Sequence, residues 1–404
     1  MEDQINGVAT SIRNKMGYIP SYRTHNHNHC IYKVPQYIRK ENEESYRPSL
    51  IAIGPIYHGD PTLQAMEELK LQHLHWFLQE GNNADNMEHY INVVCEWEEE
   101  ARSYYAHKIS VSSNDFVEML LIDAVFMIVL FMWSNSQLLL ESHPMENKAQ
   151  FLLILESDLF CEENQLPFFV LERLYDIAFG RTIFPNSTFS LVTAVFLSKS
   201  WYRESGPSET EIEQQLSLSR ASKINHLLDF VRIAYLPTKL REQFPCNRSK
   251  VDPQFPLTAT ELKAAGIKFM EGKGRMLDIS FDNGVLKIPK LIFRDSTESV
   301  LRNMAFYEQC HHFHDTYFVD YFRFLGKLVK TAGDVQILVQ SGVLLNWLGS
   351  DEEVANVLHK SSKNIILNHQ NFYYFDVSRE LNAHANTSWN RWKTILRRDY
   401  FSHP

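Results

Sequence analysis

One run of apolar residues limits the possible folds of this chain more than any other feature. Residues 124–133 read AVFMIVLFMW, and the preceding residues 119–122 are also apolar, but Asp123 interrupts the run. A helix that spans a membrane needs about 20 consecutive apolar residues, so this run is too short. We predict a helix that is buried in the core of a globular protein. Asn114 and Asp115 are suitable residues to cap its N-terminus.

Composition agrees with a folded protein of this kind. The 404 residues are 44% hydrophobic, and 15 glycines and 15 prolines are too few for a fibrous or disordered chain. The net charge of −9 argues against a nucleic-acid partner, which requires a basic face. The five cysteines are widely spaced, without a CxxC pair, and the N-terminal residues do not resemble a secretory signal. We therefore expect reduced thiols and a cytoplasmic protein.

Apolar residues recur at helical spacing along most of the chain, which predicts a mainly α protein. Residues 1–30 are polar and are expected to form a flexible arm, and residues 237–257 form a proline-containing connector. Alternation of apolar and polar residues over 277–282, followed by Asn283-Gly284, predicts a β-hairpin within residues 276–293.

Acidic and amide side chains in apolar surroundings are the first candidates for chemistry. Asp123 interrupts the most apolar helix, and Glu162-Glu163-Asn164-Gln165 lies between two apolar stretches. A carboxylate in such surroundings must find a partner or become neutral. One interpretation is a catalytic acid in a pocket, and the other is a buried polar network that holds helices together. We favour the network, because the sequence contains no Walker loop, nucleophile elbow, dinucleotide fingerprint or HExxH motif. The cations that can serve as partners are Lys70, Arg102, Arg173 and Arg302.

Two more specific predictions follow from these residues. Asp123 is expected to be buried and paired with a cation from another helix. Glu163, Asn164 and Gln165 come just before Pro167, where the N–H groups of the next helix lack partners, so we expect them to cap that helix and to tie it to a neighbour.

A histidine-rich stretch at residues 310–315 raises the question of a metal. If a helix continues through it, His311, His314 and Asp315 share one face and resemble two histidines and a carboxylate around iron. The alternative is a polar helix end, where histidines near the last carbonyl groups are electrostatically favourable. No cofactor is expected.

The C-terminal residues predict an amphipathic helix. Trp389, Trp392, Ile395 and Leu396 recur at helical spacing, with Arg391, Lys393, Arg397 and Arg398 between them. The tryptophans can pack on the core. Alternatively, this end approaches a membrane, where aromatic and basic residues favour the interface.

Several motifs together resemble the land-plant "domain of unknown function 247" family. In chain order they are residues 31–39 (IYKVPQYIR), 52–70 (AIGPIYHGDPTLQAMEELK), 123–131 (DAVFMIVLF), 158–174 (DLFCEENQLPFFVLERL), 226–232 (HLLDFVR), 264–269 (AAGIKF), 279–293 (ISFDNGVLKIPKLIF), 301–310 (LRNMAFYEQC), 333–344 (GDVQILVQSGVL) and 348–358 (LGSDEEVANVL). The resemblance begins near residue 31 and implies that residues 31–404 form a single helical domain.

The chain departs from the family pattern in three places. The family usually has two adjacent histidines after the tyrosine of its Gly-Pro motif, where this chain has only His58. Its usual RNLIAFEQ is replaced by RNMAFYEQ at 302–309, so a ligand site there would differ in shape; its binding candidates are Arg302, Asn303 and Glu308. Members usually carry a C-terminal transmembrane helix, which we do not find before the chain ends at residue 404.

The resemblance implies plasma-membrane association and, in some grass members, pollen-side control of self-incompatibility, with no general enzymatic activity. The leading hypothesis is therefore a non-enzymatic interaction or signalling protein, in recognition or defence at the membrane face, with a protein partner. We expect it in the cytoplasm, with peripheral contact to the plasma membrane. The second hypothesis is an enzyme or small-molecule-binding protein. Its pocket would use His58, Asp123 and Glu163 for catalysis and Arg102, Asn164 and Gln165 for binding.

Overall fold

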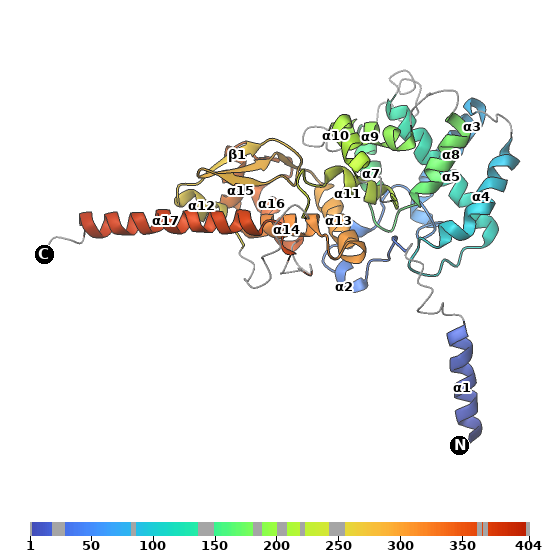
Figure 1. Ribbon diagram of the computed structural model, residues 1–404. Coiled ribbons are helices and arrows are strands. Elements are labelled where there is room, and N and C mark those ends of the chain that lie inside the picture. The colour runs from blue at the N-terminus through green and yellow to red at the C-terminus, as the bar shows by residue number, and fades with distance from the viewer. Residues whose placement is uncertain are drawn as a thin grey trace.

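The computed structural model describes residues 2–17, 29–81, 86–135, 149–180, 188–199, 208–218, 223–241, 255–361, 366 and 371–400. The protein is mainly helical with small β elements, which confirms the predicted fold class. Figure 1 shows a helical N-terminal half and a C-terminal half that contains the strands. The N-terminal half contains α2 (Gln36–Arg39), η2 (Glu44–Tyr46), η3 (Pro61–Met66), α3 (Glu67–Glu80), α4 (Met87–Arg102), α5 (Ser113–Asn135), α7 (Ala149–Leu159), α8 (Phe168–Phe179), α9 (Phe189–Lys199), α10 (Glu209–Leu218) and α11 (Leu227–Tyr235).

The predicted core helix is α5. It packs against α3, α4, α8 and α9, and almost every residue from Phe116 to Trp133 is buried. A helix that is apolar on all sides needs such complete coverage. Among the described residues, α5 is the one helix long and apolar enough to cross a membrane, but 83% of its most apolar window is buried inside the protein. This burial confirms the prediction of a core helix.

The C-terminal half contains the predicted hairpin. Strands β2 (Ser280–Asp282) and β3 (Val285–Pro289) pair antiparallel, and both turn residues have positive φ, 49° at Asn283 and 78° at Gly284. Three further short strands were not predicted, because none of them is joined to its partner by a recognisable hairpin turn. β1 (Lys268–Gly272) adds parallel to β3, and β4 (Leu291–Phe293) pairs in parallel with β5 (Leu344–Asn346).

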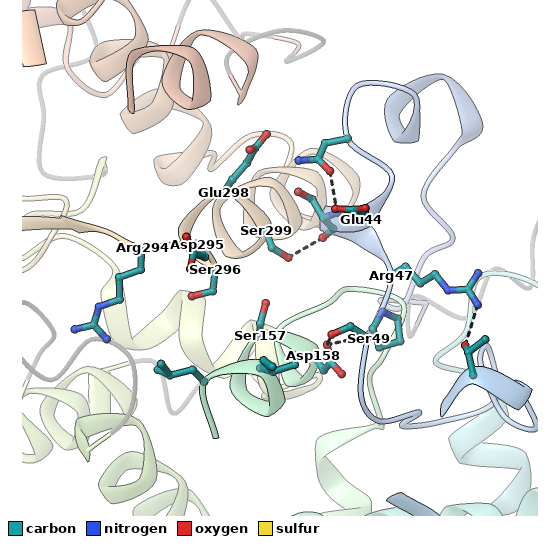
Figure 2. A pocket seen from close by; sticks show the side chains of 16 residues that line it. Glu44, Arg47, Ser49, Ser157, Asp158, Arg294, Asp295, Ser296, Glu298 and Ser299 are labelled. Carbon is teal, nitrogen blue, oxygen red and sulfur yellow. Dashed lines mark hydrogen bonds between the residues drawn. The ribbon is translucent and has the colours of Figure 1, made fainter. Parts of the chain in front are cut away.

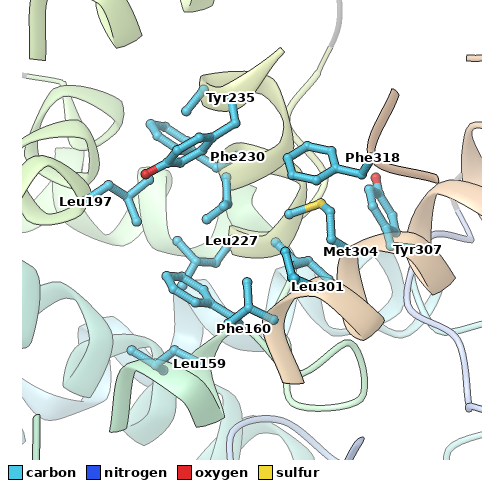
Figure 3. Packing of buried hydrophobic residues seen from close by; sticks show 14 of the residues in the cluster. Leu159, Phe160, Leu197, Leu227, Phe230, Tyr235, Leu301, Met304, Tyr307 and Phe318 are labelled. Atoms are coloured by element: carbon cyan, nitrogen blue, oxygen red, sulfur yellow. The ribbon is translucent and has the colours of Figure 1, made fainter. Parts of the chain in front are cut away.

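Helices surround these strands and continue the core. They are α12 (Ala259–Ala264), α13 (Thr297–His311), α14 (Tyr317–Leu328), α15 (Ala332–Gln340), α16 (Asp351–Ser361) and α17 (Phe375–Tyr400). One hydrophobic cluster connects the two halves. Figure 3 shows its centre, where Leu227 and Phe230 of α11 lie near Phe160 on one side and Met304 of α13 on the other.

Figure 1 shows α1 (Glu2–Gly17) apart from this body, whereas α17 begins within it, where Phe375, Leu381 and Ala385 are buried in the core. Helix α1 occupies much of the predicted flexible arm, and its described side chains are almost all exposed, whereas Cys30 is buried. Helix α17 projects from the C-terminal half. The side chains of residues 388–400, including the predicted stripe from Trp389 to Arg398, lie outside the described residues.

Candidate functional site

Residues 29–54 cross the helical body with little regular structure. Their buried N–H groups therefore need partners other than a helix or a sheet. Cys30 and Ile31 donate to the carbonyl oxygen of Tyr104, at 2.9 and 3.0 Å. Most of the other partners are side chains of residues 158–165, which form the end of α7 and the turn that leads to α8, and of Asp123. We call these side chains the turn network: Asp123, Asp158, Glu162, Glu163, Asn164 and Gln165.

Asp158 binds three consecutive residues of the crossing segment. Its carboxylate accepts hydrogen bonds from the backbone N–H groups of Ser49, Leu50 and Ile51, at 2.9, 2.6 and 3.0 Å. Burial raises the pKa of Asp158, and these N–H donors oppose that rise because they favour the charged form. The carboxylate of Asp158 therefore provides the hydrogen-bond acceptors that a neighbouring strand would otherwise provide, and so stabilises the bend at residues 49–51.

The two glutamates hold the beginning of the same segment. Glu163 accepts from the N–H of Val34, from the Tyr57 hydroxyl at 2.6 Å and from the Arg39 guanidinium, with which it forms an ion pair. Glu162 accepts from the N–H of Tyr32 at 3.0 Å through one oxygen. Its other oxygen is buried and has no hydrogen-bond partner in the described part of the chain, and burial raises the pKa of Glu162 well above its usual range.

The two amides complete the turn. The Asn164 side chain accepts from the N–H of Ile53 at 2.7 Å and donates to the carbonyl groups of Ile51 and Asp158. The Gln165 side chain accepts from the N–H of Leu228, in the first turn of α11, at 3.2 Å. The prediction that residues 163–165 cap the following helix is wrong, since the N-cap of α8 is Pro167 and has no side-chain hydrogen bond. The residues tie neighbouring segments together instead.

Asp123 is buried and paired, as predicted. One oxygen lies 2.7 Å from the Lys70 ammonium, and the other accepts from the N–H of Gly54 at 2.8 Å. Burial raises the pKa of Asp123, and Lys70 opposes the rise. Gly54 has a φ of 76°, and a Cβ atom there would lie 2.6 Å from the carbonyl oxygen of Gln165, so only glycine fits this close approach.

A surface groove of about 610 Å³ lies next to the turn network, between residues 42–49, α7 and the start of α13. In Figure 2 the side chains of Ser157 and Ser299 lie on opposite walls. The hydroxyls of Ser157 and Ser296 form no hydrogen bond to the described part of the chain, unlike the side chains of the turn network. On α7, Leu153 and Ile154 line the groove and are 43% and 39% exposed.

Comparison with known proteins decides the family. The model of DUF247, plant proteins of unknown function, matches residues 31–404.

The chain belongs to the DUF247 family.

Two curated relatives from Arabidopsis thaliana agree with this membership. A UPF0481 protein is 26% identical over 397 residues, which cover 93% of this chain and 81% of the relative. A putative UPF0481 protein is 21% identical over 426 residues, which cover 83% of this chain and 78% of the relative. No solved structure matches the chain. The motifs that carry the DUF247 resemblance meet in the turn network: residues 31–39 and 52–70 contribute crossing backbone, and residues 123–131 and 158–174 contribute side chains.

The pocket expected around His58 and Asp123 is only partly assembled in this DUF247 protein. Both residues line a cavity of about 190 Å³ together with Glu67, Asp115 and Glu118. The turn residues 163–165 do not line this cavity. Arg102 also lies elsewhere, since it pairs with Glu98 and stacks over Phe116. The Asp123 carboxylate is already occupied by Lys70 and Gly54.

The candidates on α13 also hold the fold together. Arg302 pairs with Glu298, and Asn303 accepts from the N–H of Glu162 at 2.9 Å. Glu308 accepts from the N–H groups of Tyr317, Phe318 and Val319, at 3.2, 2.8 and 3.1 Å, and so caps α14. Its carboxylate also forms an ion pair with the buried Arg232, at 2.9 Å.

The helical face on which the metal hypothesis rests is not formed, because α13 ends at His311. His311 stacks on Tyr307, and Asp315 lies near Arg232 and Arg241, at 3.6 and 3.7 Å. The carbonyl oxygen of His314 accepts from Arg241. Among the described residues, no group of three or more His, Cys, Asp or Glu side chains is placed to hold a metal ion.

A buried cluster that was not predicted lies nearby. His226 caps α11, accepting from the N–H of Asp229 through Nδ1 at 3.3 Å, and its Nε2 lies 3.2 Å from the carbonyl oxygen of Cys30. Burial lowers the pKa of His226 to about 4. His312 lies 3.5 Å from the Asp229 carboxylate, and it lowers the pKa of Asp229 despite complete burial. One local signal points to this cluster: a histidine stands three residues before an aspartate at the start of an apolar helix, which is the spacing of a helix cap.

Proposed function

We propose that this protein is a non-enzymatic interaction protein of a signalling pathway, and that it binds a protein partner in the groove beside the turn network. One contrast carries the proposal. The carboxylates of Asp123 and Glu163, the first candidates for catalysis, are occupied by cations and by backbone N–H groups. In the groove next to them, the hydroxyls of Ser157 and Ser296 have no hydrogen-bond partner among the described residues, and the apolar side chains of Leu153 and Ile154 are exposed.

The lining of the groove suits an extended peptide segment. Free hydroxyl groups can bond to the carbonyl and N–H groups of a peptide backbone, and exposed aliphatic side chains can pack against one of its side chains. A rigid support lowers the cost of binding, and the turn network supplies one, since Asp158 lies next to Ser157 and fixes the backbone at residues 49–51. A role in recognition or defence at the cytoplasmic face of the plasma membrane is part of the proposal and rests on the family resemblance alone.

A library of random peptides displayed on phage tests the groove directly. The selection uses the purified protein, and each binder is then measured on a Ser157→Trp variant, in which an indole fills the groove. Leu71→Trp, at a side chain of α3 that is 53% exposed, is the matched control. We expect peptides that bind the parent and the control but not Ser157→Trp. A selection without binders, or binders that Ser157→Trp leaves unchanged, would overturn the proposal.

A second candidate function has one observation in its favour, the cavity of about 190 Å³ that brings His58 beside Asp123. Its size suits a small ligand, and its acidic lining suits a cationic one. Native mass spectrometry of the purified protein checks this candidate. A stoichiometric small molecule that is lost in an Ile122→Trp variant would support a binding function at this cavity.

A further inference from the structure

The charged residues that line the groove differ in whether they are already paired. Arg47 forms an ion pair with Asp60 at 2.6 Å, and Glu298 forms one with Arg302 at 2.7 Å. Asp158 is occupied by backbone N–H groups. Among the described residues, Arg294 has no carboxylate within ion-pair distance, so it is the groove's unpaired cation.

Arg294 is held in place by its position in the fold. It follows β4, and Trp347 follows β5, so the parallel pairing of these strands brings the two residues side by side. The N–H of Trp347 donates to the carbonyl oxygen of Phe293 at 2.9 Å, and the Arg294 guanidinium lies over the indole ring, 4.3 Å from its centroid. A guanidinium that stacks on an aromatic ring still presents its N–H edge to a ligand.

The surroundings of Arg294 make this arrangement unusual for a surface arginine. Its Nε atom is buried and meets no hydrogen-bond acceptor among the residues that the structure describes, and the Trp347 side chain that it covers is 55% exposed. An exposed tryptophan beside an arginine is typical of a binding surface, in which Trp and Arg are enriched. The terminal Nη groups of Arg294 are not among the buried unpaired atoms, so a carboxylate in the groove can form a two-point interaction with them.

We propose that the partner segment in the groove carries one carboxylate side chain for Arg294 and an apolar side chain for Leu153 and Ile154. This inference rests on the proposed function and adds the chemistry of the partner. Glu44 and Asp295 also line the groove, are exposed and lack ion-pair partners among the described residues. They would repel the additional negative charge of a phosphate or of a run of acidic residues, so a single carboxylate fits better. The cation on the wall and the apolar surface of α7 together set the order of side chains that the groove accepts.

The peptides selected on the parent protein test this inference through their sequences and their affinities. We expect one Asp or Glu in most groove-dependent peptides, next to an aliphatic or aromatic residue. Replacing that acid by its amide should weaken binding about tenfold, and Arg294→Gln should weaken binding of the acidic peptide by a similar factor. The amide peptide should bind the parent and Arg294→Gln equally, since the two changes remove the same contact.

Arg47→Gln is the matched control, because Arg47 lines the same groove but is already paired with Asp60. It should change the affinity less than twofold. Arg294→Glu should recover binding to a peptide with Lys in place of the acid, which a variant that merely misfolds cannot do. Groove-dependent peptides without an acid, or with an affinity that Arg294→Gln does not change, would overturn the inference and leave the groove as a binding site. A library that yields no groove-dependent peptide would overturn both proposals.

Discussion

The turn network and the groove are neighbours in the chain and in space, yet the polar groups of the network are paired inside the protein and several of those in the groove are not. Asp158 belongs to the network and binds three backbone N–H groups, whereas the hydroxyl of Ser157, one residue earlier, lies on the groove wall without a hydrogen bond to any described residue. Burying a polar side chain without a hydrogen-bond partner costs free energy, so polar side chains inside the protein must be paired. Polar side chains on an open wall are hydrated and can exchange water for a ligand. The comparison shows that polarity in the DUF247 motifs supports the fold, and that the groove beside them is the place to look for function.

The largest expected effect comes from breaking the ion pair between Asp123 of the turn network and Lys70. Asp123→Ala leaves the buried Lys70 ammonium with only the half-exposed Glu67 carboxylate and the Ala52 carbonyl oxygen, at 2.8 and 2.6 Å, and should lower the free energy of unfolding by about 3 kcal/mol. Urea unfolding followed by circular dichroism measures this loss. The double variant Asp123→Leu with Lys70→Met, which removes both charges, should be more stable than Asp123→Ala. If Asp123→Ala were as stable as the parent, the network would not have the role that we give it.

An effect of similar size is expected from pH. Burial lowers the pKa of His226 from its ordinary value near 6.5 to about 4, against the attraction of Asp229 and with help from His311 and His312. Between pH 6.5 and 4 the unfolded chain takes up a proton at this residue and the folded protein does not. His226 therefore reduces stability as pH falls, by about 3 kcal/mol over the window.

His226→Gln isolates this contribution from the other titrating groups. Glu162 has the opposite effect on stability. Its pKa is higher in the folded state, so the folded protein binds the proton at a higher pH than the unfolded chain and gains stability as pH falls. The pH dependence of the parent alone therefore does not report on His226. The stability of the variant should fall less steeply between pH 6.5 and 4 than that of the parent. Parallel stability curves for the two proteins would show that His226 is charged in the folded state.

A matched pair of truncations compares the two regions most simply. Asn164→Ala leaves the N–H of Ile53 and two carbonyl groups without a partner and should cost about 2 kcal/mol. Ser157→Ala removes a hydroxyl that has no described partner and should change stability by less than about 0.5 kcal/mol. Thermal unfolding measures both. Equal losses of stability in the two variants would contradict the distinction between the structural residues of the turn network and the unpaired residues of the groove.

Much of the fold could be predicted from the sequence, because local patterns determine it. The apolar run at 124–133 predicted α5, and Asn283-Gly284 predicted the hairpin. The turn at 162–165 was recognised as a buried polar network, but its partners were not, since Asn164 and Ile53 lie 111 residues apart in the chain. The metal hypothesis assumed that one helix continues through residues 310–315. This assumption was wrong, because α13 ends at His311 and the sequence contains no helix-stop residue there. The groove was not predicted because its walls come from three distant segments.

Hydrogen exchange at residues 32–54 tests the central claim most directly. Seven backbone N–H groups there lie outside helices and strands and donate to side chains of the turn network: Tyr32, Val34, Ser49, Leu50, Ile51, Ile53 and Gly54. If the network holds this segment, these amides exchange as slowly as those of the buried helix α5, and Asn164→Ala speeds the exchange of Ile53 in particular. Exchange at the rate of an open loop in the parent protein would contradict the account.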